Sequence, residues 1–238
     1  MPRSGRGGAQ GPLPWLPPRR GFLVPRTVLI LAGGVASPEE ARFASSQADF
    51  ILAADGGFLL AQRAGLAVDL LLGDLDSLPF PPPAELPVLR VPREKDATDL
   101  ELALDHAVAL GAQRILVVGA FGARLDHTLA NANLLAKYDV PIVLFHAGSC
   151  LYLVVDGVEI QGNVGDLVSL LPLTDEARGV TTFGLRYALH EGVLLRASTR
   201  GVSNEVVATP FGVRVRTGKL LLIHIPQGGG QPCGSFGC

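Results

Sequence analysis

The sequence has few charged residues and few cysteines, and each shortage excludes a class of protein. Only 18% of its 238 residues are charged and the net charge is -2, so the chain lacks the basic excess of nucleic-acid-binding proteins. Its three cysteines, Cys150, Cys233 and Cys238, are an odd number without Cys-x-x-Cys spacing. This count argues against a zinc site or a disulfide framework and favours a reducing, cytoplasmic compartment.

Several familiar patterns are also missing. No apolar stretch reaches the roughly 18–20 residues of a membrane-spanning helix. The sequence has no G-x-x-x-x-G-K-[ST], no intact G-x-G-x-x-G and no G-x-S-x-G. A P-loop, a Rossmann dinucleotide site and a hydrolase nucleophile elbow are therefore not supported. With 48% hydrophobic residues, however, the chain is apolar enough to fold around a core.

The N-terminal segment differs from the rest of the chain. No acidic residue precedes Glu39, whereas five arginines do, so the remaining sequence is acidic. Residues 1–25 are rich in proline and glycine without apolar periodicity, which predicts a disordered tail. Arg19-Arg20 also resembles a twin-arginine export signal, but cleavage after it would remove the best candidate for a first strand, residues 27–31. We predict a second flexible tail at residues 227–238.

Two periodicities divide the body of the chain into two predicted domains. In residues 26–147, short apolar runs alternate with amphipathic segments, which is typical of an α/β domain whose mostly parallel sheet is flanked by helices. The predicted strands are 27–32, 50–54, 70–73, 88–91, 114–119 and 142–145. Residues 148–226 show a period of two without helix signals, which predicts a smaller all-β antiparallel sandwich domain. Its clearest strands flank turns at 156–157 and 217–219.

Helix signals lie between the strands of the first domain. Ser37 and Glu40 form the pattern of a capping box, and so do Thr98 and Glu101. Gly111 marks the end of the second helix. Apolar residues mark one face of a third helix: Leu125, Leu129, Ala132 and Ala136.

The chemical signal is a set of aspartates that follow predicted strands. The set comprises Asp55, Asp74, Asp76, Asp96, Asp99 and Asp126. The carboxyl ends of parallel strands meet at one edge of a sheet, so these carboxylates are predicted to converge there. Hard oxygen ligands at short spacing suit Mg²⁺, which completes its shell with phosphate oxygens and water. Each aspartate alone also fits a structural role, such as strand termination, an Asx turn or helix capping.

Groups suited to phosphate surround this set. Gly119, Gly122 and Ala123 precede the third helix, whose N-terminal N–H groups can meet an anion. Arg124 can pair with phosphate oxygens in a bidentate manner, and Lys95 supplies a point charge.

These residues together resemble the thiamine pyrophosphokinase family. The resemblance spans about residues 27–225 and keeps the order of the family's motifs. They are Ala54-Asp-Gly-Gly57, Gly73-Asp-Leu-Asp-Ser77, Lys95-Asp-Ala-Thr-Asp99, Gly119-Ala-Phe-Gly-Ala-Arg-Leu-Asp-His127 with Asn131, Ser169-Leu-Leu-Pro-Leu173, Gly184-Leu-Arg-Tyr187 and Gly201-Val-Ser-Asn204. The family's Gly-Gly-Arg is replaced here by Gly122-Ala123-Arg124.

The resemblance implies transfer of the diphosphoryl group of ATP to thiamine, giving thiamine diphosphate and AMP. It further implies a homodimer with thiamine at the dimer interface. The implied metal ligands for Mg²⁺ are Asp74, Asp76 and Asp99, and with Arg124 they form the implied catalytic set. The implied ATP site comprises Asp55, Gly56, Lys95, Asp96, Thr98, Arg124, Asp126, His127 and Asn131. Ser203 and Asn204 resemble the family's thiamine-binding pair.

Two other functions stay open from the sequence. A diphosphokinase with the same acidic site could act on another alcohol, such as a hydroxymethyl pterin. A non-catalytic nucleotide-sensing module is the alternative from a different class, and a broken aspartate set would indicate it.

Overall fold

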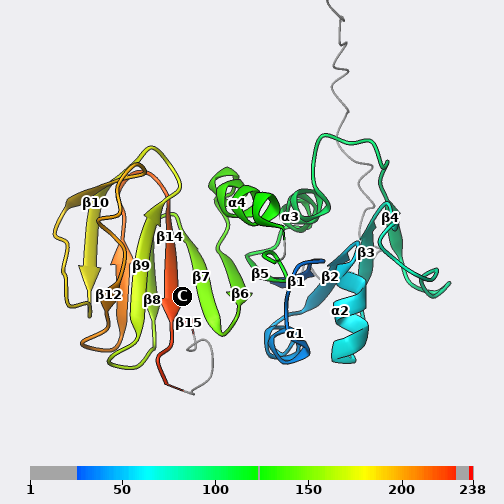
Figure 1. Ribbon diagram of the computed structural model, residues 1–238, viewed down its shortest axis with the longest axis horizontal. Helices are drawn as coiled ribbons and strands as arrows, with labels where there is room; N and C mark the ends of the chain where they lie inside the picture. Colours follow the sequence, from blue (N-terminus) through cyan, green and yellow to red (C-terminus); the bar gives the residue numbers. More distant parts are fainter. Residues whose placement is uncertain (1–25, 123, 229–235, 238) are drawn as a thin grey trace, which may run out of the picture.

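A computed structural model describes residues 26–122, 124–228 and 236–237, so the predicted tail at 1–25 lies outside the described residues. Within these ranges the chain forms one ten-stranded sheet and one five-stranded sheet (Figure 1). Part of the larger sheet is parallel, and its strands in spatial order are β6 (Ile142–His146), β5 (Arg114–Val118), β1 (Thr27–Leu31), β2 (Phe50–Ala54), β3 (Leu70–Gly73) and β4 (Val88–Arg90). All six predicted strands are confirmed, each with ends within one residue of the prediction.

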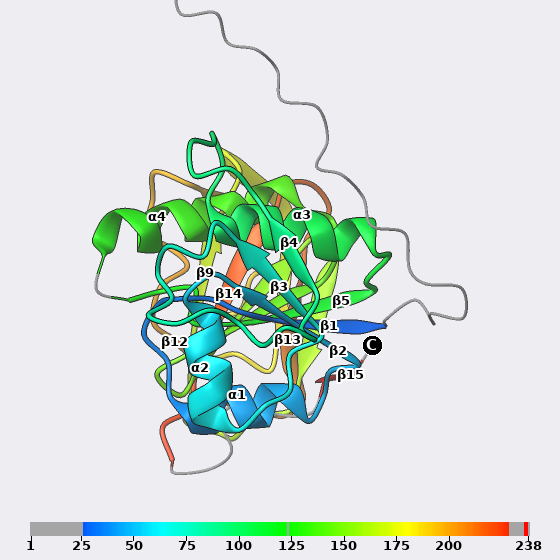
Figure 2. The same ribbon diagram turned by 90° about the vertical axis from the view of Figure 1, so that its right-hand side faces the viewer.

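Helices cover both faces of the parallel strands. Figure 2 shows α3 (Asp99–Ala109) and α4 (Leu125–Leu134) on one face and α1 (Pro38–Ser45) and α2 (Gly57–Ala64) on the other. The short 3₁₀ helix η1 (Leu135–Lys137) follows α4. Successive residues of β1 point to opposite faces, so Val28 and Ile30 pack in the core under α3, whereas Leu29 and Leu31 pack under α1 and α2.

The helix signals are confirmed in part. Ser37 and Glu40 form the complete capping box at the start of α1, with both bonds at 3.1 Å. Thr98 accepts a hydrogen bond from the Glu101 N–H at 3.2 Å, but the Glu101 carboxylate pairs with Lys137 instead of closing the second box. No helix was predicted for residues 57–64, where α2 forms, because its N-cap Gly56 provides no capping side chain.

The apolar face predicted for the third helix (α4) is buried only in part: Ala132 and Ala136 pack against the core, whereas the two leucines do not. Leu125 and Leu129 are 70% and 57% exposed, and Asn131 is the buried residue of this helix. These leucines therefore contribute little to the core of the described chain.

The second half of the chain forms a sandwich, as predicted, but it shares the larger sheet. Four antiparallel strands extend the parallel strands beyond β6: β7 (Ser149–Val154), β14 (Leu220–Ile225), β9 (Leu167–Pro172) and β12 (Asn204–Glu205). The smaller sheet packs against them and contains, in spatial order, β11 (Gly192–Leu195), β10 (Glu176–Phe183), β13 (Phe211–Arg214), β8 (Gly157–Ile160) and β15 (Phe236–Gly237).

One local expectation for this half is confirmed and another is wrong. Strands flank the turns at 156–157 and 217–219 as predicted, but the flanking strands do not pair with each other, because β7 and β14 pair in the larger sheet while β8 and β13 pair in the smaller one. Both turns carry the chain between the sheets. Residues 227–238 are also not wholly a free tail, since β15 pairs with β8.

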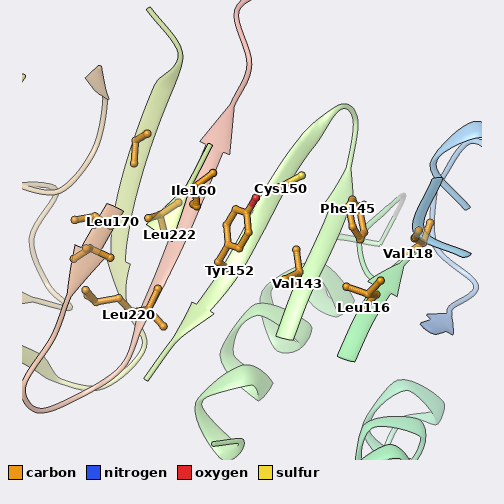
Figure 3. Close-up of a cluster of buried hydrophobic side chains, with 14 of the residues drawn as sticks. Leu116, Val118, Val143, Phe145, Cys150, Tyr152, Ile160, Leu170, Leu220 and Leu222 are labelled. Carbon is orange, nitrogen blue, oxygen red and sulfur yellow. The ribbon is translucent and has the colours of Figure 1, made fainter. Parts of the chain in front are cut away.

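A single hydrophobic core crosses the predicted domain boundary at residue 147. Figure 3 shows buried side chains along one face of the sheet, from Leu116 on β5 through Phe145 on β6 and Tyr152 on β7 to Leu222 on β14. The strands β6 and β7 are hydrogen-bonded neighbours, joined through a turn at Ala147-Gly148. The predicted halves are thus continuous in both sheet and core.

Cys150 corrects the interpretation of the cysteine count. It is fully buried on β7 and disulfide-bonded, whereas Cys233 and Cys238 lie outside the described residues. An odd number of cysteines did not exclude a disulfide, since one residue can remain unpaired. Among the described residues, no helix is long and apolar enough to cross a membrane.

Candidate active site

The candidate site lies where the order of the parallel strands reverses. The chain runs from β1 outward through β2, β3 and β4, and then returns to the other side of β1 as β5. The loops after β1 and β5 consequently lead to helices on opposite faces of the sheet, which opens a crevice at the carboxyl edge. Backbone bonds join the two loops: the Gly34 N–H donates to Gly119 O at 2.9 Å, and the Val35 N–H donates to Phe121 O at 2.7 Å.

Glycine is required at this junction. A Cβ atom on Gly34 would lie 2.3 Å from Phe121 O, and one on Gly119 would lie 2.4 Å from Ala32 O. Gly119 also has φ of +81°, in the left-handed region that favours glycine. The glycines therefore let two loop backbones approach closely at the floor of the crevice.

Asp55 occupies a constrained position at the end of β2. Its φ is 44°, and its N–H donates to Leu72 O at 2.7 Å. The residue is only 8% exposed, and its Oδ1 atom is buried without a hydrogen-bond partner among the described residues. An unpartnered buried carboxylate oxygen is costly unless a cation or a proton reaches it.

Asp55, Asp74 and Asp76 come together in one cluster. One carboxylate oxygen from each lies within 4.8 Å of the others. Asp74 and Asp76 follow β3, and the Asp76 N–H donates to Asp74 Oδ1 at 3.1 Å, which is the leading cause of the lowered pKa of Asp74. Three carboxylates, one of them with an unpartnered buried oxygen, fit a hard divalent cation.

Lys95 forms a second cationic position beside this cluster. Its Nζ atom lies 3.3 Å from Asp74 Oδ2 and 3.2 Å from Asp99 Oδ1, and its side chain is 10% exposed. Burial lowers the pKa of Lys95, but its bonds to Asp99 and Asp74 outweigh that effect and raise it overall. Burial raises the pKa of Asp99 despite this pairing.

The carboxylate cluster contains Asp55 where the predicted metal set has Asp99. The assignment of Asp99 as a metal ligand stays a prediction. Asp99 begins α3 and faces Lys95.

Arg124 and Asp126 pair with each other at the start of α4. The Arg124 guanidinium donates from Nε to Asp126 Oδ1 at 3.2 Å and from Nη2 to Asp126 Oδ2. This pairing lowers the pKa of Asp126 to about 2 and raises that of Arg124. Both side chains are largely exposed, so the pair is accessible to a ligand. Ala123 lies outside the described residues.

Most of the predicted site residues line one cavity of 1180 Å³ at this edge. They are Asp55, Gly56, Asp74, Asp76, Lys95, Thr98, Asp99, Arg124, His127 and Asn131. Asp96 and Asp126 are not among the lining residues. Asn131 lines the cavity, but its Nδ2 donates to Ala120 O at 2.6 Å, which holds the loop after β5 against α4.

The cavity has further lining residues that no sequence motif indicates. They are contributed mainly by the loop after β1, by α2 and by the segment after β3, and include Val35, Gln62, Arg63, Phe80 and Arg93. Arg93 pairs with Asp76 at 3.2 Å. No local pattern marks Arg63 or Gln62, because the helix that carries them was missed.

Ser203 and Asn204 lie away from the cavity, in the sandwich. Asn204 begins β12, which is separated from β1 by β9, β14, β7, β6 and β5. Six strand spacings of about 4.8 Å amount to about 29 Å. In one chain, therefore, this pair does not contribute to the cavity.

Fold and site together define a class of protein: an α/β domain with an acidic cavity at its switch point and an attached β-sandwich. Comparison with known proteins is consistent with this class. Residues 42–144 match the family described as "Thiamin pyrophosphokinase, catalytic domain", and residues 158–222 match "Thiamin pyrophosphokinase, vitamin B1 binding domain". The chain belongs to the thiamin pyrophosphokinase family.

Individual relatives resemble this chain over most of its length. Thiamine pyrophosphokinase from Bacillus subtilis (strain 168) is 28% identical over 212 residues, covering 84% of this chain and 98% of the relative. Thiamine pyrophosphokinase 1 from Arabidopsis thaliana is 26% identical, covering 71% and 70%. The crystal structure of thiamin pyrophosphokinase from Geobacillus thermodenitrificans is 30% identical, with a TM-score of 0.72, and the match covers 85% of this chain and 99% of that one.

Proposed function

We propose that this protein transfers the diphosphoryl group of ATP to the hydroxyl of thiamine, forming thiamine diphosphate and AMP. The observation that carries the proposal is the presence of both family domains in order, with four carboxylates of the first domain lining the cavity: Asp55, Asp74, Asp76 and Asp99. ATP is the co-substrate, and the cavity is large enough for its polyphosphate and a metal ion.

We assign the catalytic electrostatics to the carboxylates, Arg124 and Lys95. Asp74 and Asp76, with Asp55 or Asp99, would hold Mg²⁺; the buried unpartnered oxygen of Asp55 supports its place in this set. Bound Mg²⁺ would neutralise charge on phosphate oxygens. Arg124 would bind the polyphosphate by exchanging part of its pairing with Asp126 for phosphate oxygens. Lys95 adds a positive charge at the other side of the cluster.

The chemical step would be an in-line displacement. The thiamine hydroxyl attacks the β-phosphorus, the bond from this phosphorus to the oxygen of the α-phosphate breaks, and AMP leaves. Asp99 is our candidate to accept the hydroxyl proton, since burial raises its pKa. Loss of the proton to water is the competing route.

Identification of the adenine product tests the function directly. Incubation with Mg-ATP and thiamine should give AMP and thiamine diphosphate in equal amounts, and no AMP without an acceptor. AMP formed with a hydroxymethyl pterin instead would favour the other diphosphokinase, and ADP would indicate an ordinary kinase. Absence of turnover with any acceptor would favour the sensing module.

Substitution of the aspartates tests the metal assignment. Asp74→Asn or Asp76→Asn should lower turnover on the order of 100-fold or more while the far-UV circular dichroism spectrum stays unchanged. Asp175→Asn, at an exposed position outside the cavity, is the matched control. Near-normal turnover in both site variants would exclude these residues as metal ligands.

We further propose a homodimer in which the sandwich of one copy covers the cavity of the other. The separation of about 29 Å between β12 and β1 supports this arrangement, and so do the exposed leucines of α4 beside the cavity. Mixing two inactive variants, Asp74→Asn and Ser203→Trp, should restore activity through mixed dimers. If mixing gives no gain in activity and light scattering shows a monomeric mass, the dimer is contradicted.

We also propose a cytoplasmic location, which the requirement for ATP supports. The cysteine content no longer supports it, since Cys150 is disulfide-bonded.

A further inference from the structure

Almost all hydrogen-bonding groups of the Asn204 side chain have partners within the protein. Its Oδ1 atom accepts hydrogen bonds from the Tyr187 N–H and the Glu205 N–H, both at 2.9 Å, and its Nδ2 atom donates to Tyr187 O at 2.8 Å. An asparagine amide has two donor hydrogens and two acceptor sites, so three of its four bonds are made. Asn204 therefore has at most one N–H left for a ligand.

The two bonds to Tyr187 clamp that residue at both ends of its backbone. The segment before it is also paired with β12 and its continuation: the Arg186 N–H donates to Glu205 O at 2.9 Å, and the Val207 N–H donates to Gly184 O at 2.9 Å. Tyr187 is thus held on a fixed backbone although it lies in a connection between β10 and β11.

Tyr187 is 66% exposed, compared with 43% for Phe80. An aromatic ring held out on a rigid backbone binds a ligand with little loss of conformational entropy. Its face attracts cations. The positive charge of the adjacent Arg186 is offset by its ion pair with Glu205 at 2.9 Å.

Ser203 directly precedes Asn204, whose side chain holds Tyr187, and it is also fixed in place. It has φ of 62°, and its N–H donates to the Ser169 hydroxyl on β9 at 3.1 Å. The Ser203 hydroxyl has no hydrogen-bond partner among the described residues, so it can serve a ligand. A hydroxyl and an aromatic face together suit a small aromatic cation.

We propose that the ring of Tyr187 stacks on the positively charged thiazolium of thiamine, and that Asn204 positions this ring instead of contacting thiamine through its own amide. The inference rests on the proposed function, since thiamine is the aromatic cation in question. It assigns Tyr187 as a binding residue and Asn204 as a positioning residue.

Direct binding measurements test the inference independently of turnover. Calorimetry on the full-length protein would use two probes: thiamine, and the neutral analogue in which carbon replaces the thiazolium nitrogen. Tyr187→Leu should raise the Kd for thiamine about 3- to 30-fold, and that for the neutral analogue by less. Tyr187→Phe keeps the ring and should change the Kd for thiamine by about 2-fold at most. An unchanged Kd in Tyr187→Leu would overturn the stacking.

A double-mutant cycle tests the role of Asn204. Asn204→Ala should raise the Kd and the KM for thiamine but not the KM for ATP, and adding it to Tyr187→Leu should weaken thiamine binding no further. Additive losses would show that Asn204 contacts thiamine directly and would overturn its positioning role. Wild-type protein that binds thiamine without forming AMP would refute the proposed function but leave these measurements decisive, whereas wild-type protein that does not bind thiamine would refute both.

Discussion

At the scale of single residues, Lys95 serves as an internal counter-ion for the acidic cluster. It bridges Asp74 and Asp99, which would otherwise face each other across the cavity wall with equal charge. Lys95→Met should therefore lower the free energy of unfolding by about 1–3 kcal/mol in the absence of divalent cations. Lys95→Arg, which keeps the charge, should lose less.

Added Mg²⁺ should recover part of that stability in Lys95→Met, because an external cation then takes over the neutralisation. Urea unfolding with and without Mg²⁺ measures both effects. A variant as stable as the wild type without Mg²⁺ would show that Lys95 is not needed as a counter-ion.

A second residue-scale prediction concerns Asp166, which is 1% exposed. Burial alone would raise its pKa, but hydrogen bonds from the Asn163 and Gln227 N–H groups and from His224 lower it overall. A lowered pKa means that the ionised form is favoured by folding, so its contribution is present above the unfolded value of about 3.9 and is lost as the pH falls through the folded value. Asp166→Asn should accordingly be less stable than the wild type at pH 7. In urea titrations, the difference in free energy of unfolding between the two proteins should narrow below about pH 4. A difference independent of pH would contradict this role of Asp166.

At the scale of elements, α2 depends on the absence of a side chain at its first residue. A Cβ atom on Gly57 would lie 1.9 Å from Leu31 O on β1, whereas one on Gly65, just after the same helix, would meet no atom within 4 Å. Gly57→Ala should therefore shift α2 away from the sheet and cost about 3 kcal/mol or more. Gly65→Ala, strained only by its φ of 69°, should cost about 1 kcal/mol. Equal melting temperatures for the two variants would refute the steric argument.

Local patterns predicted the elements well where pairing was not needed to recognise them. The six parallel strands are continuous apolar runs, and the cap of α1 is formed by residues only three positions apart. The helix α2 was missed because it begins at the pair Gly56-Gly57. Close packing excludes a side chain at Gly57 and the N-cap Gly56 has none, so no capping residue marks the start of the helix. The turns at 156–157 and 217–219 were recognised, but whether a turn closes a hairpin depends on partners 50 or more residues away along the chain.

The candidate site was likewise predictable only in part. Aspartates at strand ends predicted the cluster, because topology alone brings them to one edge. The preference for Asp55 over Asp99 beside Asp74 could not be predicted, since it depends on where Lys95 points.

At the scale of the whole molecule, the two halves are not separable folding units. The strands β6 and β7 share hydrogen bonds across the predicted boundary, and one core runs beneath both. A fragment of residues 26–147 should consequently expose the edge of β6 and the side chains of Val143 and Phe145, and should aggregate or bind the dye ANS. A soluble fragment with a cooperative thermal transition would contradict this.

The sheet that joins the halves also acts as a spacer of fixed length. Two domains on a flexible linker can bring distant residues together by swinging, but a hydrogen-bonded sheet resists such bending. In this chain the distance from the aspartate cavity to Tyr187 and Ser203 is set by the number of intervening strands. Under the proposed assembly, activity therefore depends on one copy meeting another, so the specific activity should fall on dilution even though every chain remains folded.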